Sequence, residues 1–76
     1  MKVHLSGHLN FYEAQRRSDF EVYLAQPMAA IDLIRDWGIP AGEVFLVTVN
    51  NAVVDLHEAV VADADHLGLY PPAGGG

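Results

Sequence analysis

The start of the chain alternates between apolar and polar residues. The apolar positions of this alternation are Val3, Leu5, Gly7, Leu9 and Phe11. Successive side chains of a strand point to opposite faces, so a period of two predicts a half-buried strand over this segment. A polar loop is expected over residues 13–19. A second alternating segment follows at residues 20–24, and we expect it to pair with the first strand in the antiparallel sense.

The period then changes to that of a helix. An apolar stripe is formed by Met28, Ala30, Ile31, Leu33, Ile34 and Trp37. Pro27 suits the first turn of a helix, because the N–H that proline lacks is not needed there. Gly38 and Pro40 are typical signals for the end of a helix. The pattern therefore predicts a core-packed helix of about three turns.

Strand-like segments fill much of the remaining sequence. Residues 43–50 are rich in β-branched and aromatic side chains and predict a central strand, with Phe45, Val47 and Val49 on one face. Asn50-Asn51 is a turn candidate, because asparagine tolerates positive φ better than most residues. A short strand is expected at Val53 and Val54.

The segment from residue 55 to residue 65 predicts an extended connection rather than a helix. In the last strand, Leu67 and Leu69 share one face, and Gly68 and Tyr70 the other. Pro71 ends the pairing because it has no N–H to donate. Short strands and one helix around a single core indicate an α+β domain with the helix laid across one face of the sheet.

Composition limits the possible chemistry. The chain has 76 residues and no cysteine, which excludes a disulfide scaffold, a thiolate zinc site and a cysteine nucleophile. Such a short chain leaves little room for a deep active site. Met1 and Lys2 lead into the alternating segment, so we expect no signal peptide. No apolar run approaches the roughly 20 residues of a membrane span, and a cytoplasmic protein without membrane contact is expected.

The net charge of −6 is unevenly distributed. The four lysines and arginines are Lys2, Arg16, Arg17 and Arg35, and none follows Arg35. The later part of the chain is therefore expected to attract basic protein surfaces and to repel phosphates. Binding to nucleic acid is not expected, because neutralising phosphates requires many lysines and arginines.

The sequence ends in two prolines, an alanine and three glycines. We expect residues 1–70 to form the domain and residues 71–76 to form a flexible tail. Glycines without β-carbons can enter a narrow slot that is closed to other residues. Such a tail suits a partner enzyme that does chemistry on the carboxylate of Gly76. The alternative is a frayed end without a function.

Three motifs resemble those of the MoaD/ThiS sulfur carriers. Val49-Asn50-Asn51 is similar to the Val-Asn-Gly turn of that family, and Asp63-Ala64-Asp65 to its Asp-Gly-Asp element. The ending Leu69-Tyr70-Pro71-Pro72, followed by two residues and Gly75-Gly76, is similar to the family's hydrophobic–aromatic–Pro-Pro–x–x–Gly-Gly ending. Two family glycines are replaced here by Asn51 and Ala64. The resemblance covers essentially the whole chain, and the Pro-Pro pair is closer to the molybdopterin branch than to the thiamine branch.

The resemblance implies a ubiquitin-like β-grasp fold, with a mixed sheet of four to five strands packed on one helix. It also implies that Gly76 is adenylated by an E1-like enzyme using ATP and then converted to a thiocarboxylate. The partners would be that enzyme, a sulfur donor, and an acceptor such as the large subunit of molybdopterin synthase or thiazole synthase. The chain would be a substrate or subunit rather than an enzyme, with no bound cofactor. The residues expected to contact partners are Tyr70, Pro71, Pro72, Gly74 and Gly75.

Two other functions are compatible with the same residues. A ubiquitin-like modifier would also be adenylated at Gly76 but joined to lysines of other proteins. A plain β-grasp interaction domain would not use its glycines. Tyr70 could contact a partner or simply cover the sheet.

Histidines and carboxylates elsewhere in the sequence suggest little chemistry. His4 and His8 would lie about 13 Å apart along a strand, which is too far for one metal ion. The residues of a conceivable carboxylate–imidazole pair are Asp55, His57, Asp63, Asp65 and His66, but no nucleophile accompanies them. Asp63 and Asp65 are expected to shape the turn before the last strand, since aspartates accept hydrogen bonds from local N–H groups.

Overall fold

Seven strands, one α-helix and two 3-10 helices occur in the computed structural model, which describes residues 1–72. In chain order they are β1 (Lys2–Leu5), η1 (Gly7–Tyr12), β2 (Asp19–Glu21), β3 (Met28–Ala29), α1 (Ala30–Asp36), η2 (Ala41–Glu43), β4 (Leu46–Val49), β5 (Ala52–Val54), β6 (Val60–Val61) and β7 (His66–Tyr70). Five strands form one sheet in the order β2-β1-β7-β4-β5, and β3 pairs with β6 separately.

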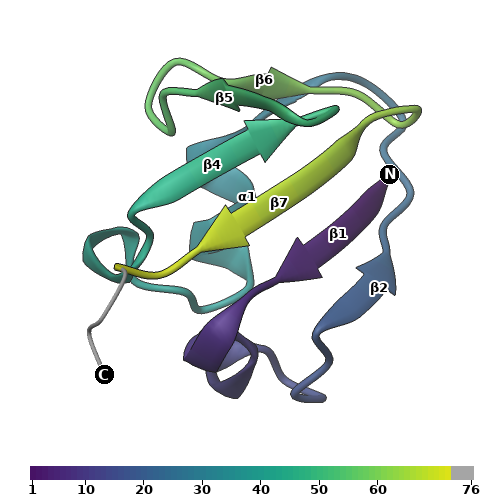
Figure 1. Cartoon of the computed structure of the whole chain (residues 1–76). Coiled ribbons are helices and arrows are strands. Elements are labelled where there is room, and N and C mark those ends of the chain that lie inside the picture. Colours follow the sequence, from purple (N-terminus) through teal and green to yellow (C-terminus); the bar gives the residue numbers. More distant parts are fainter. Residues whose placement is uncertain (73–76) are drawn as a thin grey trace.

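The five-stranded sheet is mixed. β1 runs antiparallel to β2 and parallel to β7, while β4 runs antiparallel to both β7 and β5. Helix α1 lies behind this sheet in Figure 1, so one face of the sheet is covered and the other is open. The predicted α+β class, the sheet of four to five strands and the helix on one face are all confirmed for the described residues.

The core lies between the covered face of the sheet and α1. Strand alternation directs Val3, Leu5, Val47, Leu67 and Leu69 to this face, where all five are buried. The helix contributes the buried residues Ala30, Leu33 and Ile34. The predicted apolar stripe therefore does pack on the core, with Met28, Ile31 and Trp37 partly buried at its edge.

The prediction of one strand from residue 3 to residue 11 is wrong. β1 ends at Leu5, and the chain then turns into η1. Gly7 makes the turn with a φ of +58°, a conformation that glycine adopts without the steric penalty of a β-carbon. Leu9 remains buried after the turn, but Phe11 is 64% exposed. The apolar alternation past Leu5 was misleading, because Leu9 is buried by the 3-10 helix and not by a continuing strand.

The predicted helix begins too early. Met28 and Ala29 form β3, which pairs with β6, a strand the sequence did not indicate. The N–H of Ala30 donates to the carbonyl of Ala59 at 3.0 Å, so the start of α1 is also tied to the segment before β6. Pro27 therefore lies outside the helix. The helix has seven residues and ends before Gly38, whose φ is +78°.

Two further details of the strands differ from the prediction. β4 begins at Leu46, and Phe45 is 71% exposed rather than packed with Val47 and Val49. The central strand of the sheet is β7, with β4 next to it. β7 is the central strand because β1 pairs with one of its edges and β4 pairs with the other.

The Asn50-Asn51 turn is confirmed. Asn50 has a φ of +53° and Asn51 a φ of +69°, as a type I′ hairpin turn requires. The Asn50 side chain also reaches the start of β7. Its oxygen accepts from the N–H of His66, and its nitrogen donates to Asp65, both at 2.9 Å. The turn thus anchors the beginning of the central strand.

Asp65 shapes the turn before β7, as predicted. Its carboxylate accepts from the N–H of Ala62 at 2.8 Å, in addition to the bond from Asn50. Asp63 instead reaches across the molecule and accepts from the N–H of Leu24 at 2.9 Å. The bond from Asn50 lowers the pKa of Asp65, and the bond from Leu24 lowers that of Asp63.

A buried carboxylate organises the loop between η1 and β2. Glu13 is only 6% exposed, and Arg17 donates to it through its guanidinium at 2.8 Å. The backbone N–H groups of Gln15 and Arg17 donate to the same carboxylate at 3.0 and 2.8 Å. The side-chain bond from Arg17, with these backbone bonds, lowers the pKa of Glu13 from 4.5 to about 2.

We expect Glu13→Gln to lower the free energy of unfolding at pH 7. The pKa of Glu13 is lower in the folded state than in the unfolded state, so its ionised form stabilises the fold above about pH 4.5. This contribution disappears as the pH falls from 4.5 towards 2. Urea titrations of wild type and Glu13→Gln across this range check the prediction. Glu58→Gln, at an exposed position, is the matched control, and a difference between wild type and Glu13→Gln that does not narrow at low pH contradicts it.

We expect Asn50→Gly to lower the free energy of unfolding by about 1–3 kcal/mol, because it removes two hydrogen bonds while keeping positive φ accessible. Asn51→Gly is the control, since it keeps both bonds and relieves a side chain held at positive φ. Its effect should stay within about 0.5 kcal/mol of wild type. Chemical denaturation of both variants provides the measurement. Equal losses in the two variants would show that the bonds of Asn50 do not anchor β7.

Candidate functional site

The end of β7 is held on both sides. The carbonyl of Leu69 accepts from the N–H of Ser6 at 2.9 Å, and the carbonyl of Tyr70 accepts from the N–H of Phe45 at 2.8 Å. These bonds come from the residue after β1 and from the residue before β4, which are far apart in the sequence. The backbone is thus fixed up to the residue that precedes Pro71.

Pro71 packs against Gly7. A β-carbon placed on Gly7 would lie 2.7 Å from Cγ of Pro71, closer than real β-carbons approach another atom. Pro71 is half-buried, and Pro72 is exposed. We call Gly7, Phe45, Tyr70, Pro71 and Pro72 the exit site, because residues 73–76 follow directly from it.

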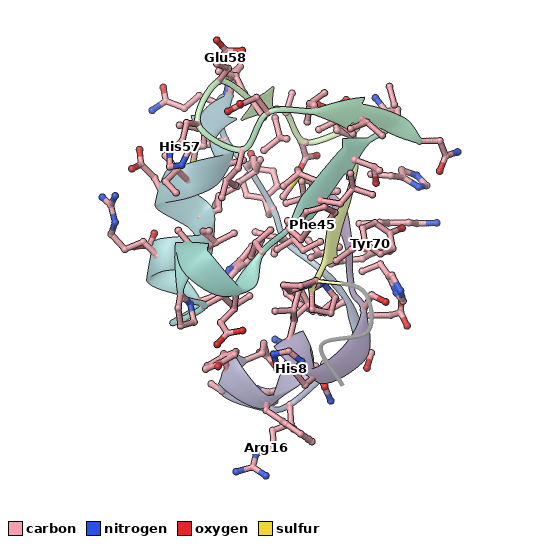
Figure 2. The ribbon with its side chains drawn as sticks, turned by 60° about the vertical axis from the view of Figure 1, so that its left-hand side comes forward. His8, Arg16, Phe45, His57, Glu58 and Tyr70 are labelled. Carbon is pink, nitrogen blue, oxygen red and sulfur yellow. The ribbon has the colours of Figure 1, made fainter. Side chains whose placement is uncertain are left out.

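Figure 2 shows Phe45, Tyr70 and His8 around this end of the molecule. Phe45 presents an aromatic ring that is 71% exposed. His8 Nε2 lies 3.4 Å from a carboxylate oxygen of Glu43, and this contact links η1 to η2. The surroundings of the exit site therefore combine exposed aromatic surface with polar groups. Such surface is typical of protein interfaces.

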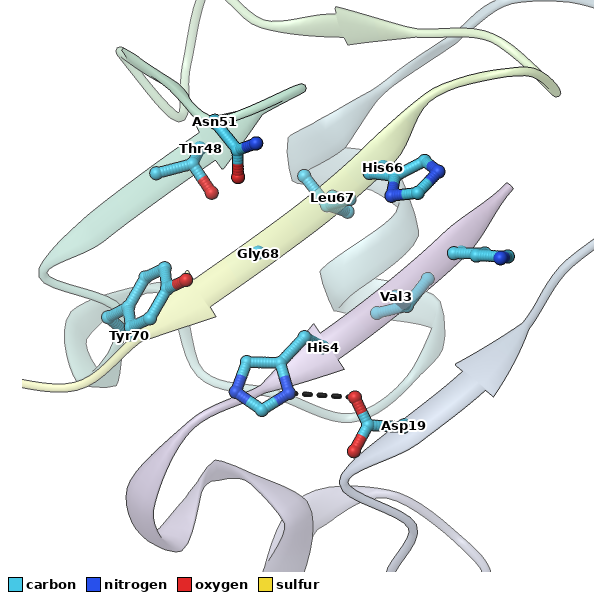
Figure 3. A pocket seen from close by; sticks show the side chains of 10 residues that line it. Val3, His4, Asp19, Thr48, Asn51, His66, Leu67, Gly68 and Tyr70 are labelled. Carbon is cyan, nitrogen blue, oxygen red and sulfur yellow. Dashed lines mark hydrogen bonds and ion pairs between the residues drawn. The ribbon is translucent and has the colours of Figure 1, made fainter.

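Tyr70 lies along the open face of its own strand. A β-carbon on Gly68 would be 3.1 Å from the hydroxyl of Tyr70 and 2.5 Å from the hydroxyl oxygen of Thr48. Tyr70 and Thr48 thus cover Gly68, which is buried on a face that no helix covers (Figure 3). Tyr70 therefore covers the sheet. Contact with a partner, the other role considered for it, stays a prediction.

A shallow hollow of about 240 Å³ lies beside Tyr70 on the open face. His4 Nδ1 and a carboxylate oxygen of Asp19 are 2.8 Å apart at its edge (Figure 3). The antiparallel register of β1 with β2 places these two residues opposite each other. His4 and Asp19 are exposed, so the pair has no dry environment in which proton transfer would be favoured.

The carboxylates and histidines singled out in the sequence have separate roles. Asp55 accepts from the backbone N–H of His57 at 2.8 Å. Asp63 and Asp65 accept the bonds described above, and no carboxylate–imidazole pair among them is organised for catalysis. Residues 1–72 contain no group of three or more His, Cys, Asp or Glu side chains that could hold a metal ion. In the same residues, no helix is long and apolar enough to cross a membrane.

The structure places three of the expected partner-contact residues, Tyr70, Pro71 and Pro72, together at the exit site. Gly74, Gly75 and Gly76 lie outside the described residues. Pairing in the sheet stops at Tyr70, which agrees with the role expected of Pro71.

Two members of the exit site, Gly7 and Phe45, were missed from the sequence. A glycine inside a strand-like alternation is a known sign of a bend or of close backbone approach, and this signal could have identified Gly7. No comparable signal distinguishes Phe45 from a core residue.

No family model matches the sequence, and a search of curated proteins finds no match. The functional interpretation therefore depends on the residues and contacts of the exit site.

We expect Gly68→Ala to lower the free energy of unfolding by about 1–3 kcal/mol, because its methyl group must displace the side chains of Thr48 and Tyr70. The double variant Thr48→Ala/Gly68→Ala should lose less stability than the sum of the two single variants. Thermal or urea denaturation measures these differences. Gly42→Ala is the control, because a β-carbon on Gly42 would meet nothing within 4 Å. Strict additivity of the two substitutions contradicts the close packing over Gly68.

Proposed function

We propose that this protein is a sulfur carrier of the MoaD/ThiS type, with a β-grasp fold, that carries sulfur as a thiocarboxylate on Gly76. The observation that supports this most directly is the exit site. The backbone is fixed up to Tyr70, and Pro71-Pro72-Ala73-Gly74-Gly75-Gly76 follows at once. A rigid domain that presents such a segment suits loading by another enzyme.

The architecture is compatible with the proposed fold. In a β-grasp domain a helix crosses one face of a mixed sheet whose first and last strands are parallel neighbours. Here β1 and β7 are parallel neighbours, and α1 covers one face. The N-terminal hairpin of β1 and β2 and the hairpin of β4 and β5 flank β7 on its two sides.

The proposed chemistry begins with a poor electrophile. A carboxylate resists nucleophilic attack until it is joined to AMP, with release of pyrophosphate from ATP. A hydrosulfide then attacks the carbonyl carbon, a C–S bond forms, and the C–O bond to AMP breaks. The product is the thiocarboxylate of Gly76. Because the chain has no cysteine, the sulfur must come from a separate donor.

The dimensions and charge of the chain fit this role. Residues 71–76 can span at most about 20 Å when extended, enough to reach from the domain into a partner's active site. No lysine or arginine follows Arg35, so this part of the chain favours partners with basic surfaces. The partners proposed are an E1-like adenylating enzyme and an acceptor enzyme that uses the sulfur to build a cofactor of the molybdopterin or thiamine type.

We expect iodoacetamide to label the protein after incubation with its cognate adenylating enzyme, ATP and sulfide. The absence of cysteine makes a C-terminal thiocarboxylate the expected site of alkylation. Trypsin releases residues 36–76 as one peptide, because Arg35 is the last basic cleavage site, and this peptide contains no methionine. Fragment masses of residues 71–76 then locate the label without interference from methionine oxidation. They also verify that Gly76 is the last residue.

Gly76→Val and Gly75→Val are the matched variants. A β-branched side chain should block entry into a channel shaped for glycine and reduce kcat/KM for adenylation by about 100-fold. The fold should be unchanged in both, as judged by the melting temperature. Normal ATP–pyrophosphate exchange with either variant, or no label on wild type, would contradict the proposal. Covalent conjugates to lysines of other proteins would instead identify a ubiquitin-like modifier.

A further inference from the structure

We infer that Gly7 is a positioning residue for the C-terminal segment, because it provides the space in which Pro71 is seated. This inference rests on the proposed function. It adds a residue from the start of the chain to a site otherwise formed by its end.

The register of the sheet leads to this contact. β1 and β7 are parallel, with Leu5 opposite Leu69. Continuing this register by two residues places Gly7 opposite Pro71. The last bond along this edge runs from the N–H of Ser6 to the carbonyl of Leu69, at 2.9 Å. Pro71 cannot extend the ladder, since it has no N–H.

The Pro71 ring occupies space that a side chain on the neighbouring strand would need. A β-carbon on Gly7 would lie 2.7 Å from Cγ of Pro71 and 3.4 Å from its Cδ. Both atoms belong to a closed ring, which can change its pucker but cannot swing aside as the end of a long side chain can. A residue with a β-carbon at position 7 must therefore shift the Pro71 ring or its own backbone, and either shift disturbs the contact between them.

Gly7 is also constrained by its own backbone. Its φ of +58° turns the chain out of β1 and into η1. This turn leaves the path beside β1 open for Pro71. Two requirements, a left-handed conformation and an absent β-carbon, thus meet at one residue. Gly38 has only the first requirement, because a β-carbon there would meet just the carbonyl oxygen of Tyr12 at 3.4 Å.

The consequence for loading is geometric. Pro71 seated on Gly7, together with Tyr70 bonded to Phe45, gives the segment after it a fixed starting point and direction. A fixed origin reduces the conformational freedom that is lost when the segment enters a partner. If Pro71 moves, the segment starts from a variable position, and productive entry becomes rarer.

The first test is amide hydrogen exchange measured by NMR. In Gly7→Ala and Gly7→Asn, exchange at the N–H groups of Ser6 and Phe45 should accelerate by about tenfold or more relative to wild type, because the displaced Pro71 loosens both acceptor carbonyls. Exchange within β4 should change much less. Asparagine tolerates positive φ, so Gly7→Asn separates the effect of the β-carbon from that of the conformation. Gly38→Ala is the control for backbone strain without a clash on Pro71.

The second test is ATP–pyrophosphate exchange with the cognate adenylating enzyme. Gly7→Ala should lower kcat/KM by about tenfold, whereas Gly38→Ala should leave it close to wild type. In the double variant Gly7→Ala/Pro71→Ala the clash with the ring is absent. The loss of exchange protection and of kcat/KM caused by Gly7→Ala should therefore be clearly smaller in the Pro71→Ala background than in wild type. If Gly7→Ala alone does not fold, the double variant should still fold, with exchange protection and kcat/KM close to those of Pro71→Ala.

Unchanged exchange at Phe45 in Gly7→Ala would overturn the inference, and so would unchanged adenylation. Additive effects of the Gly7 and Pro71 substitutions would overturn it as well. If the proposed function itself is wrong, the result is different, because the adenylating enzyme does not adenylate even the wild-type protein. In that case the role in loading is refuted along with the proposed function, and the exchange data alone decide whether Gly7 seats Pro71.

Discussion

The parallel pairing of β1 with β7 is the constraint on which the rest of the structure depends. It places the first and last strands of the chain next to each other in the interior of the sheet. The outer edge of β1 is then free to pair with β2, and the outer edge of β7 is free to pair with β4. The core side chains of β1 and β7 face α1. The same pairing brings Gly7 to Pro71. The exit site is therefore a direct result of the sheet topology.

Polar side chains support this topology at points where the sheet alone does not hold the chain. Asp63 accepts from Leu24, and the Asn50 side chain bonds to His66, so loops far apart in sequence are joined. Glu13 and Arg17 organise the loop that returns to β2. In a small domain without disulfides, such bonds between loops restrict the path of the chain between strands. They also explain why several of its carboxylates have lowered pKa values.

Prediction from the sequence succeeded where one local pattern decided the outcome. The alternation of Leu67 and Leu69 predicted β7, and two asparagines with tolerance for positive φ predicted the β4–β5 turn. It failed where a distant segment competed for the same backbone. Met28 continued the helical stripe, but its strand pairs with Val61, more than thirty residues later. Phe45 is a different kind of failure, because it fitted the strand pattern but lies one residue before β4 with its side chain 71% exposed.

By itself, the sequence determined the α+β class, the covered faces of the main strands, the Asn50-Asn51 turn and the end of pairing at Pro71. Each of these depends on residues within a few positions of one another. Only the tertiary structure decided that β7 is central, that β3 pairs with β6, and that Gly7 faces Pro71. These features depend on which distant backbones pair and in what register, and a periodic pattern along the chain does not specify a partner.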